Sequence, residues 1–189
     1  MKGKLIVFSA PSGAGKTSIV HALLKQHPFL EFSVSATSRS PRPGEVHGVD
    51  YFFIPGVEFA SQIKSGSFLE WEEVYAGTFY GTLWTEVERI WQKGHHVVFD
   101  VDVAGGIKIK KKFGSDALSI FIMPPSLQVL EERLRNRNTE SQESLNKRIG
   151  KAQYEMEFAS EFDQVVINDN LADAVAKASE LIVNFVGLP

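Results

Sequence analysis

One glycine-rich turn near the start of the chain restricts the possible fold more than any other feature of the sequence. Residues 4–8 form a short apolar run, residues 10–17 read APSGAGKT, and residues 16–26 have the apolar spacing of a helix. The turn fits the phosphate-loop pattern G-x-x-x-x-G-K-[ST], except that Ala10 stands in place of the first glycine. A phosphate-binding loop requires a strand before it and a helix after it. The sequence therefore predicts a strand–loop–helix unit of an α/β fold.

The phosphate loop also predicts a binding site for a nucleoside triphosphate. Gly13 and Gly15 let the backbone curl so that consecutive N–H groups face one anion, and the start of the following helix adds partial positive charge. Lys16 can reach the β- and γ-phosphates, and the Thr17 hydroxyl can ligate Mg²⁺. We therefore expect the triphosphate to contact the whole loop, which consists of Ala10, Pro11, Ser12, Gly13, Ala14, Gly15, Lys16 and Thr17.

Further short apolar runs predict a parallel sheet. They span residues 96–101, 117–123 and 164–167, and segments with helical patterns lie around them at residues 82–93, 127–137, 141–158 and 171–185. Continuous apolar strands of this length suit a sheet that is buried on both faces, and the alternation of strand and helix implies right-handed crossovers. The predicted fold is a P-loop type parallel sheet flanked by helices.

Composition excludes several other classes of protein. The chain has 189 residues, which suits one domain, and 43% of them are hydrophobic. The net charge of −3 argues against duplex nucleic acid as the main partner. The sequence contains no cysteine and no apolar run of about 18 residues, so we expect neither a disulfide framework nor a membrane span. We expect a cytoplasmic location.

Two polar regions interrupt the alternation of strands and helices. Residues 32–80 predict a small β-rich insertion, and residues 136–144 predict a loop between two helices. We expect neither region to bury a core of its own. Within the insertion, Arg39 and Arg42 flank Pro41, and two guanidinium groups at this spacing can clamp one phosphate with bidentate bonds.

The strand predicted at residues 96–101 contains an acidic residue near its end. Asp100 follows the apolar residues VVF, and Asp102 lies two residues further on the same face. A carboxylate at this place resembles the Walker B position, which holds Mg²⁺ near the phosphates. The alternative is an aspartate that only stabilises the turn at the end of the strand, and both interpretations stay open.

Motifs at six places in the chain resemble the guanylate kinase family. They read SAPSGAGKT at 9–17, SATSRSPRPGEVHGVDYFF at 35–53, FLEW at 68–71, FYGT at 79–82, DVD at 100–102 and RLRNRNTE at 133–140. They occur in the order of that family and extend over nearly the whole chain. The arginine–proline block at 35–53 is highly specific, so the resemblance is close.

This resemblance implies transfer of the γ-phosphoryl group of ATP to GMP or dGMP, assisted by Mg²⁺. Ser35 and Glu70 would read the guanine base, because a hydroxyl suits its O6 acceptor and a carboxylate suits its N1 and N2 donors. Thr82 and Asp100 would complete this pocket. The GMP phosphate would be held by Arg39, Arg42, Tyr51 and Tyr80.

The resemblance implies further roles on the ATP side. Arg137 and Arg148 would stabilise charge on the transferring phosphoryl group, so that the expected catalytic residues are Lys16, Arg39, Arg137 and Arg148. Mg²⁺ would be bound by Thr17, and by Asp100 through a water molecule. Further contacts to ATP would come from Arg133, Asn168 and Asp169. The last two could also cap the helix at 171–185.

The family pattern divides the single domain into three parts. These are a core at 1–31, 83–135 and 149–189, a GMP-binding insertion at about 32–82 and a mobile lid at about 136–148. The family often has a glutamine after the D-x-D motif, where this chain has Ala104.

Two alternative functions stay open. Some guanylate-kinase-like domains bind peptides and have lost catalysis, but the intact phosphate loop argues against that class. A related P-loop kinase could act on a sugar phosphate, but Ser35 and Glu70 would have no use there.

Overall fold

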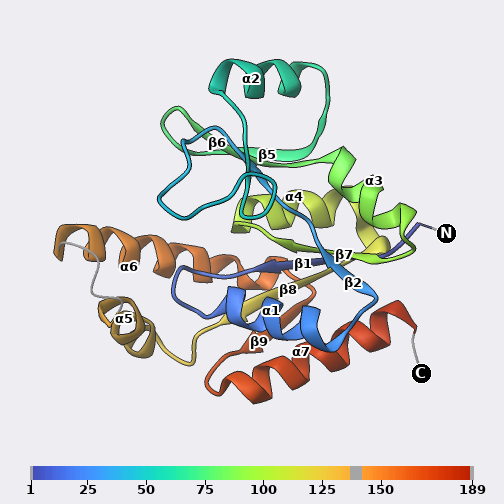
Figure 1. The fold of residues 1–189 in the computed structure, drawn as a ribbon. Helices are drawn as coiled ribbons and strands as arrows, with labels where there is room; N and C mark the ends of the chain where they lie inside the picture. The colour runs from blue at the N-terminus through green and yellow to red at the C-terminus, as the bar shows by residue number, and fades with distance from the viewer. Residues whose placement is uncertain (1, 137–141, 188–189) are drawn as a thin grey trace.

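A five-stranded parallel sheet forms the centre of the molecule (Figure 1). The structure is a computed structural model, and it describes residues 2–136 and 142–187. The strand order is β2-β7-β1-β8-β9, and every neighbouring pair is parallel. The strands are β1 (Leu5–Ser9), β2 (Leu30–Phe32), β7 (His96–Asp100), β8 (Ala117–Met123) and β9 (Gln164–Ile167). The predicted parallel sheet is confirmed.

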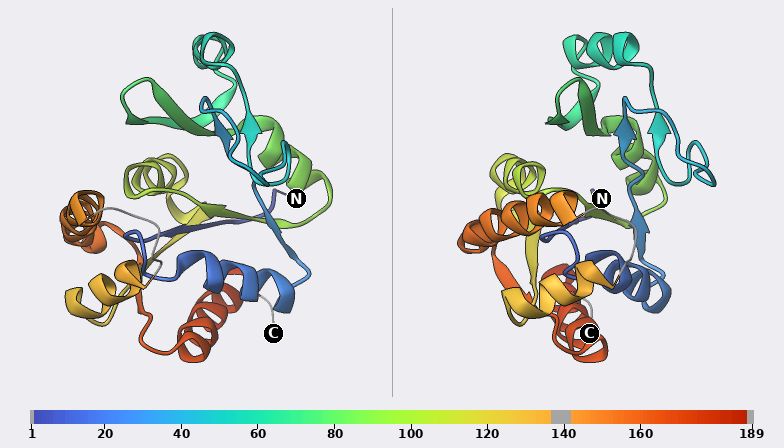
Figure 2. Two further views of the ribbon diagram at one scale, coloured as in Figure 1. Left: turned by 60° about the vertical axis from the view of Figure 1, so that its left-hand side comes forward. Right: turned by 90° about the vertical axis from the view of Figure 1, so that its left-hand side faces the viewer.

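Helices cover both faces of this sheet (Figure 2). On one face lie α1 (Lys16–Gln26) and α7 (Leu171–Val186), whose buried side chains pack against Ile6 and Phe8 of β1. On the other face lie α3 (Trp84–Gln92) and α4 (Val103–Phe113), whose side chains join the cluster around Leu5 and Val7. Successive residues of β1 thus supply two separate cores, which explains why its sequence is apolar without alternation.

A second, four-stranded sheet lies above the core in Figure 1. Its order is β4-β3-β6-β5, with β3 (Ala36–Thr37), β4 (Phe52–Phe53), β5 (Phe68–Tyr75) and β6 (Thr78–Leu83). The helix α2 (Gly56–Lys64) packs on it, and Phe59 of α2 stacks on Phe68 with ring centroids 4.3 Å apart. The expectation that this region buries no core of its own was wrong, because Phe59 is fully buried there.

Two helices, α5 (Leu127–Arg135) and α6 (Gln142–Met156), form a further small cluster with Leu130, Leu134 and Leu145. The short 3-10 helices η1 (Gly114–Asp116) and η2 (Glu157–Glu161) precede β8 and β9. No helix among the described residues has the length and apolar character needed to cross a bilayer.

Side chains cap both α5 and α7. The Ser126 side chain accepts from the Val129 N–H at 3.2 Å and caps α5. Helix α7, however, is capped by Asn170, whose Oδ1 accepts from the Ala172 N–H at 2.8 Å. The expectation that Asn168 or Asp169 caps this helix was wrong, because the helix begins one residue beyond their reach.

Candidate functional site

A cleft of about 750 Å³ lies between the phosphate loop, the second sheet and α6. Parallel sheets place their ligand sites at the carboxyl ends of the strands, and this cleft lies at the ends of β1 and β7. The residues that line it include Pro11, Ser12, Gly13, Gly15, Lys16 and Thr17 from the loop, Ser35, Arg42 and Tyr51 from the segments next to β3 and β4, Glu70 and Tyr80 from β5 and β6, Asp100 and Asp102 from the end of β7, and Arg148, Lys151 and Glu155 from α6.

The phosphate loop has the backbone shape that its sequence predicts. Gly13 and Gly15 have φ angles of +93° and +91°, a region that residues with a Cβ rarely adopt. A Cβ on Gly15 would also lie 2.3 Å from Nδ2 of Asn168. The same Nδ2 donates to the Ala14 carbonyl at 2.7 Å. Asn168 is buried and therefore supports the loop from behind.

The two polar side chains that end the loop both meet Asp100. The Lys16 ammonium forms an ion pair with Asp100 and donates to the Val101 carbonyl at 2.8 Å. The Thr17 hydroxyl donates to the other Asp100 oxygen at 3.2 Å. A hydroxyl and a carboxylate side by side are hard oxygen donors of the kind that Mg²⁺ prefers, so these residues fit that ion.

Asp102 has a clear structural task. Its Oδ1 accepts from the Gly105 N–H at 2.7 Å and caps α4, although the residue also lines the cleft. Of the two roles left open for these aspartates, the structural one therefore applies to Asp102, and the position near the phosphate loop applies to Asp100. Asp100 faces the loop, and Asp102 holds a helix end.

Glu70 is a buried carboxylate on the second-sheet side of the cleft, with an exposed fraction of 8%. Thr82 donates its hydroxyl proton to Oε1 of Glu70 at 2.8 Å. Burial raises the pKa of Glu70 to about 7, the hydrogen bond from Thr82 opposes this, and the nearby Asp102 adds to it. The carboxyl group is thus poised to change its charge near neutral pH.

Gly105 is a contributor to this pocket that the sequence interpretation missed. A Cβ at this position would lie 2.9 Å from Oε2 of Glu70 and 3.1 Å from Oδ1 of Asp102. The signal in the sequence was the pair of consecutive glycines within a helix, Gly105 and Gly106, because glycine inside a helix is unfavourable without a packing reason.

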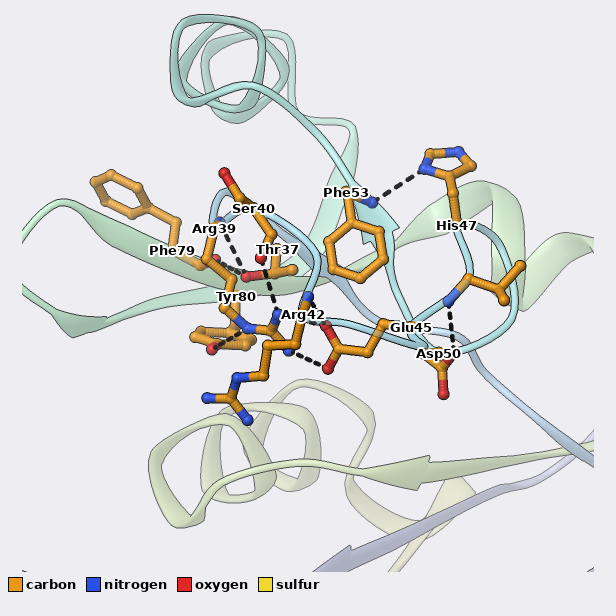
Figure 3. Close-up of polar contacts among 11 residues, drawn as sticks. Thr37, Arg39, Ser40, Arg42, Glu45, His47, Asp50, Phe53, Phe79 and Tyr80 are labelled. Atoms are coloured by element: carbon orange, nitrogen blue, oxygen red, sulfur yellow. Dashed lines mark hydrogen bonds and ion pairs between the residues drawn. The ribbon is translucent and has the colours of Figure 1, made fainter. Parts of the chain in front are cut away.

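The arginine loop, residues 38–51, does not present its two guanidinium groups in the same way (Figure 3). Arg39 donates from Nη1 and Nη2 to the two carboxylate oxygens of Glu45 at 2.6 and 2.7 Å, and from Nε to the Tyr80 hydroxyl at 3.2 Å. Its guanidinium also lies 5.0 Å from the ring centroid of Tyr51. Arg42 instead lines the cleft, and in Figure 3 its side chain extends away from Glu45.

Glu45 is the second contributor that the sequence interpretation missed. The hydrogen bonds from Arg39, with one from the Arg42 backbone N–H at 2.7 Å, lower the pKa of Glu45 to about 2. Glu45 therefore remains ionised and occupies the bidentate face of Arg39. The predicted clamp of two arginines is present here as one arginine on the cleft wall and one behind it.

The residues predicted on the ATP side are found in different settings. Arg148 of α6 donates to the Ser12 hydroxyl at 2.6 Å, so it reaches the phosphate loop. Arg133 donates to the carbonyls of Asn168 and Asp169 at 3.0 and 3.3 Å, which ties α5 to the end of β9. Arg137 lies outside the described residues.

Comparison with known proteins agrees with the motifs. A family model described as guanylate kinase matches residues 2–184. A guanylate kinase of Bacteroides thetaiotaomicron is 53% identical over 98% of this chain and 91% of its own. One of Chlorobium chlorochromatii is 46% identical over 98% of this chain and 97% of its own. The crystal structure of guanylate kinase from Anaplasma phagocytophilum is 29% identical and superposes with a TM-score of 0.78, covering 97% of this chain and 86% of that one.

Proposed function

Because the chain belongs to the guanylate kinase family, we propose that it transfers the γ-phosphoryl group of ATP to GMP, and to dGMP, giving ADP and the nucleoside diphosphate. One observation supports this most directly. A single cleft of about 750 Å³ is lined both by a phosphate loop and by a buried carboxylate, Glu70. The remaining polar groups fall on the two sides of this cleft.

On the ATP side, the loop N–H groups would bind the β-phosphate, and Lys16 would bind the β- and γ-phosphates. Lys16 must exchange its contact with Asp100 for the phosphates as ATP enters. Mg²⁺ would be held by Thr17, with Asp100 binding through a water molecule. When bound, the ion neutralises charge on the phosphates.

On the GMP side, the Glu70 carboxylate would accept from N1–H and N2–H of guanine, and Ser35 would donate to O6. Thr82 keeps one Glu70 oxygen oriented at 2.8 Å. Adenine presents a donor where guanine has O6 and an unprotonated nitrogen at N1. AMP would therefore leave buried polar groups unpaired and would be rejected.

The transfer itself would need positioning and charge stabilisation rather than covalent help from the protein. A phosphate oxygen of GMP forms a bond to the γ-phosphorus while the bond from that phosphorus to the bridging oxygen of ADP breaks. Arg42, Tyr51 and Tyr80 would hold the GMP phosphate, with Arg39 oriented behind them. Arg148, together with Arg137, would stabilise the negative charge on the phosphoryl group during its transfer.

The proposal includes movement of two parts of the chain. The insertion at about 32–82 and the lid at about 136–148 would close over both nucleotides and exclude water, which would otherwise accept the phosphoryl group. It also includes a cytoplasmic location and small-molecule nucleotides, rather than nucleic acid or membrane, as the partners.

An ADP-release assay with ATP and Mg²⁺ tests the proposal. The acceptor panel is GMP, dGMP, AMP, CMP, UMP and ribose 1,5-bisphosphate. We expect turnover with GMP and dGMP alone. Turnover with the sugar phosphate alone would replace the guanine pocket by a different acceptor site. Absence of turnover in folded protein that still binds GMP would identify a binding module.

A further inference from the structure

The chain passes between the two sheets at two adjacent places. It leaves the core after β2 through residues 33–35, and it returns from β6 into α3 at residues 83–84. At the first crossing, the Ser33 N–H donates to the Val98 carbonyl of the core sheet at 3.0 Å. The Ser35 carbonyl accepts from the Phe52 N–H of the second sheet at 2.9 Å. Val34 is therefore the residue at which the backbone changes from one sheet to the other.

Neither sheet accepts the N–H of Val34. It donates instead to Oε2 of Glu86, in the first turn of α3, at 3.1 Å. Glu86 is buried, with an exposed fraction of 5%. A hydrogen bond to an ionised acceptor is stronger than one between neutral groups, and a carboxylate near a helix start is favoured by the helix dipole. A charged, buried side chain thus holds the backbone at the crossing point.

Glu86 is itself held in one orientation. Arg89 donates from Nε to its Oε1 at 2.8 Å and from Nη2 to its Oε2 at 3.0 Å. Arg89 also pairs with Glu31 of β2, the last core strand before the crossing. Burial acts to raise the pKa of Glu31, but hydrogen bonds from Lys93, Arg89 and His95 lower it to about 2. The chain of contacts runs from β2, through α3, to Val34.

Two contacts between α4 and β5 are of a different kind. Lys108 and Lys112 of α4 donate to the carbonyls of Trp71 and Leu69 of β5 at 3.3 and 3.0 Å. Lysine side chains are long and flexible, so these bonds allow the sheets to shift. The Glu86 carboxylate is instead buried, and Arg89 donates to both of its oxygens, so its contact with the Val34 N–H has less freedom to shift.

From this arrangement we propose that Glu86 is a positioning residue for the acceptor side of the reaction: through the N–H of Val34 it sets the place of Ser35 at the cleft wall. Glu86 lies behind Ser35 and acts on it through one residue of backbone. This inference rests on the proposed function, in which Ser35 reads guanine. It assigns a role in acceptor binding to a buried carboxylate that the transfer mechanism does not use.

Two substitutions of Glu86 separate the effect of its side-chain length from the effect of its charge. Glu86→Asp keeps the charge beside Arg89 but is one methylene shorter, so it loses contact with Val34. Glu86→Gln keeps an acceptor oxygen at the required reach but loses the ion pair. We expect Glu86→Asp to raise the KM for GMP about fivefold and to change the KM for ATP by less than about twofold. Glu86→Gln should lower the melting temperature yet keep the KM for GMP within about twofold.

Glu88→Gln provides the matched control, because Glu88 is an exposed glutamate on the same helix. The KM values for GMP of the two Glu86 variants test the proposal. An unchanged KM for GMP in Glu86→Asp, or a rise in Glu86→Gln equal to that in Glu86→Asp, would overturn it. If KM follows the melting temperature for both substrates, the role of Glu86 is only structural.

A second readout does not depend on catalysis. Hydrogen exchange of the segment containing residues 33–35 should be faster in Glu86→Asp than in wild type, and close to wild type in Glu86→Gln. Equal exchange in both variants would overturn the proposed contact. Failure of the wild-type enzyme to phosphorylate GMP would instead count against the proposed function, and the exchange measurement would still decide the role of Glu86.

Discussion

The phosphate loop and the arginine loop each place a cation beside a carboxylate, but they secure that cation in different ways. Lys16 forms an ion pair with Asp100, which belongs to a separate strand, and a bound phosphate can replace Asp100 as the partner of Lys16. Arg39 donates two hydrogen bonds to Glu45 of the same loop, and its Nε donates a third to the Tyr80 hydroxyl. The first arrangement leaves a cation ready to change partner. The second fixes a cation so that it orients its neighbours.

This difference reflects how each anion site is built. The phosphate loop binds with backbone N–H groups that are adjacent in sequence, so one mobile side chain suffices. The proposed acceptor site takes Arg42 and Tyr51 from two places in the arginine loop and Tyr80 from β6. Side chains from distant segments need bracing to stay aligned, and the Arg39–Glu45 pair supplies it.

The largest effect should come from the mobile cation. Lys16→Met should lower kcat by about a thousandfold, since a preorganised charge at the phosphates is lost. The melting temperature should change little, because the contact with Asp100 lies at the surface of the cleft. Steady-state kinetics and a thermal melt measure both. A fully active variant would remove the phosphate-loop assignment.

The guanine side should respond through binding. Glu70→Gln replaces one acceptor oxygen by a donor that faces the N–H groups of guanine. We expect the KM for GMP to rise about a hundredfold, while calorimetric binding of ATP stays the same. Unchanged kinetics with GMP would exclude Glu70 from the pocket. Glu73→Gln is the matched comparison, because Glu73 is an exposed glutamate on the same strand and does not line the cleft.

The raised pKa of Glu70 predicts pH dependence in two directions. Guanine binding requires the ionised form, so affinity for guanosine should fall about tenfold from pH 8 to pH 6, with an inflection near 7. Guanosine is used because it lacks a phosphate that titrates in this range. In the ligand-free protein the neutral carboxyl is favoured by burial. Its contribution to stability is thus complete below pH 4.5 and is lost as the pH rises through about 7. Glu70→Gln should abolish both effects.

The smallest effect should come from the brace. Glu45→Gln leaves one oxygen for Arg39 and frees part of its guanidinium. We expect the KM for GMP to rise about fivefold with kcat nearly unchanged. Glu58→Gln, an exposed glutamate on α2, serves as the control. A gain in GMP affinity would show that Glu45 blocks Arg39 instead of orienting it.

The parts of the molecule that were predictable from sequence are those set by local backbone and pattern. The phosphate loop and the apolar strands depend on neighbours in the chain, and the structure contains them. The motif around Arg39 predicted a phosphate site, but a motif does not tell which donors of an arginine are already in use. Only the three-dimensional structure reveals that Glu45 already accepts from two donors of Arg39.

Other features depended on packing between distant segments. The small core under α2 requires Phe59 to meet Phe68, which the polar composition of the region concealed. Glu86 looks like an ordinary charged residue on a surface helix, but it is buried and accepts a hydrogen bond from the Val34 N–H. Charge patterns on one helix cannot reveal such a contact, because its partner is a backbone N–H.

The adjacency of the two crossings has a consequence for how the chain folds. Strands β2 and β7 pair with Leu30 beside His96, although the whole second sheet lies between them in sequence. Closing so long a loop costs entropy that must be overcome before the pairing contributes. A second sheet that has already formed holds residues 33 and 84 near each other, so the remaining loop is short. We therefore expect early formation of the inserted sheet to speed the closure of the core around β7.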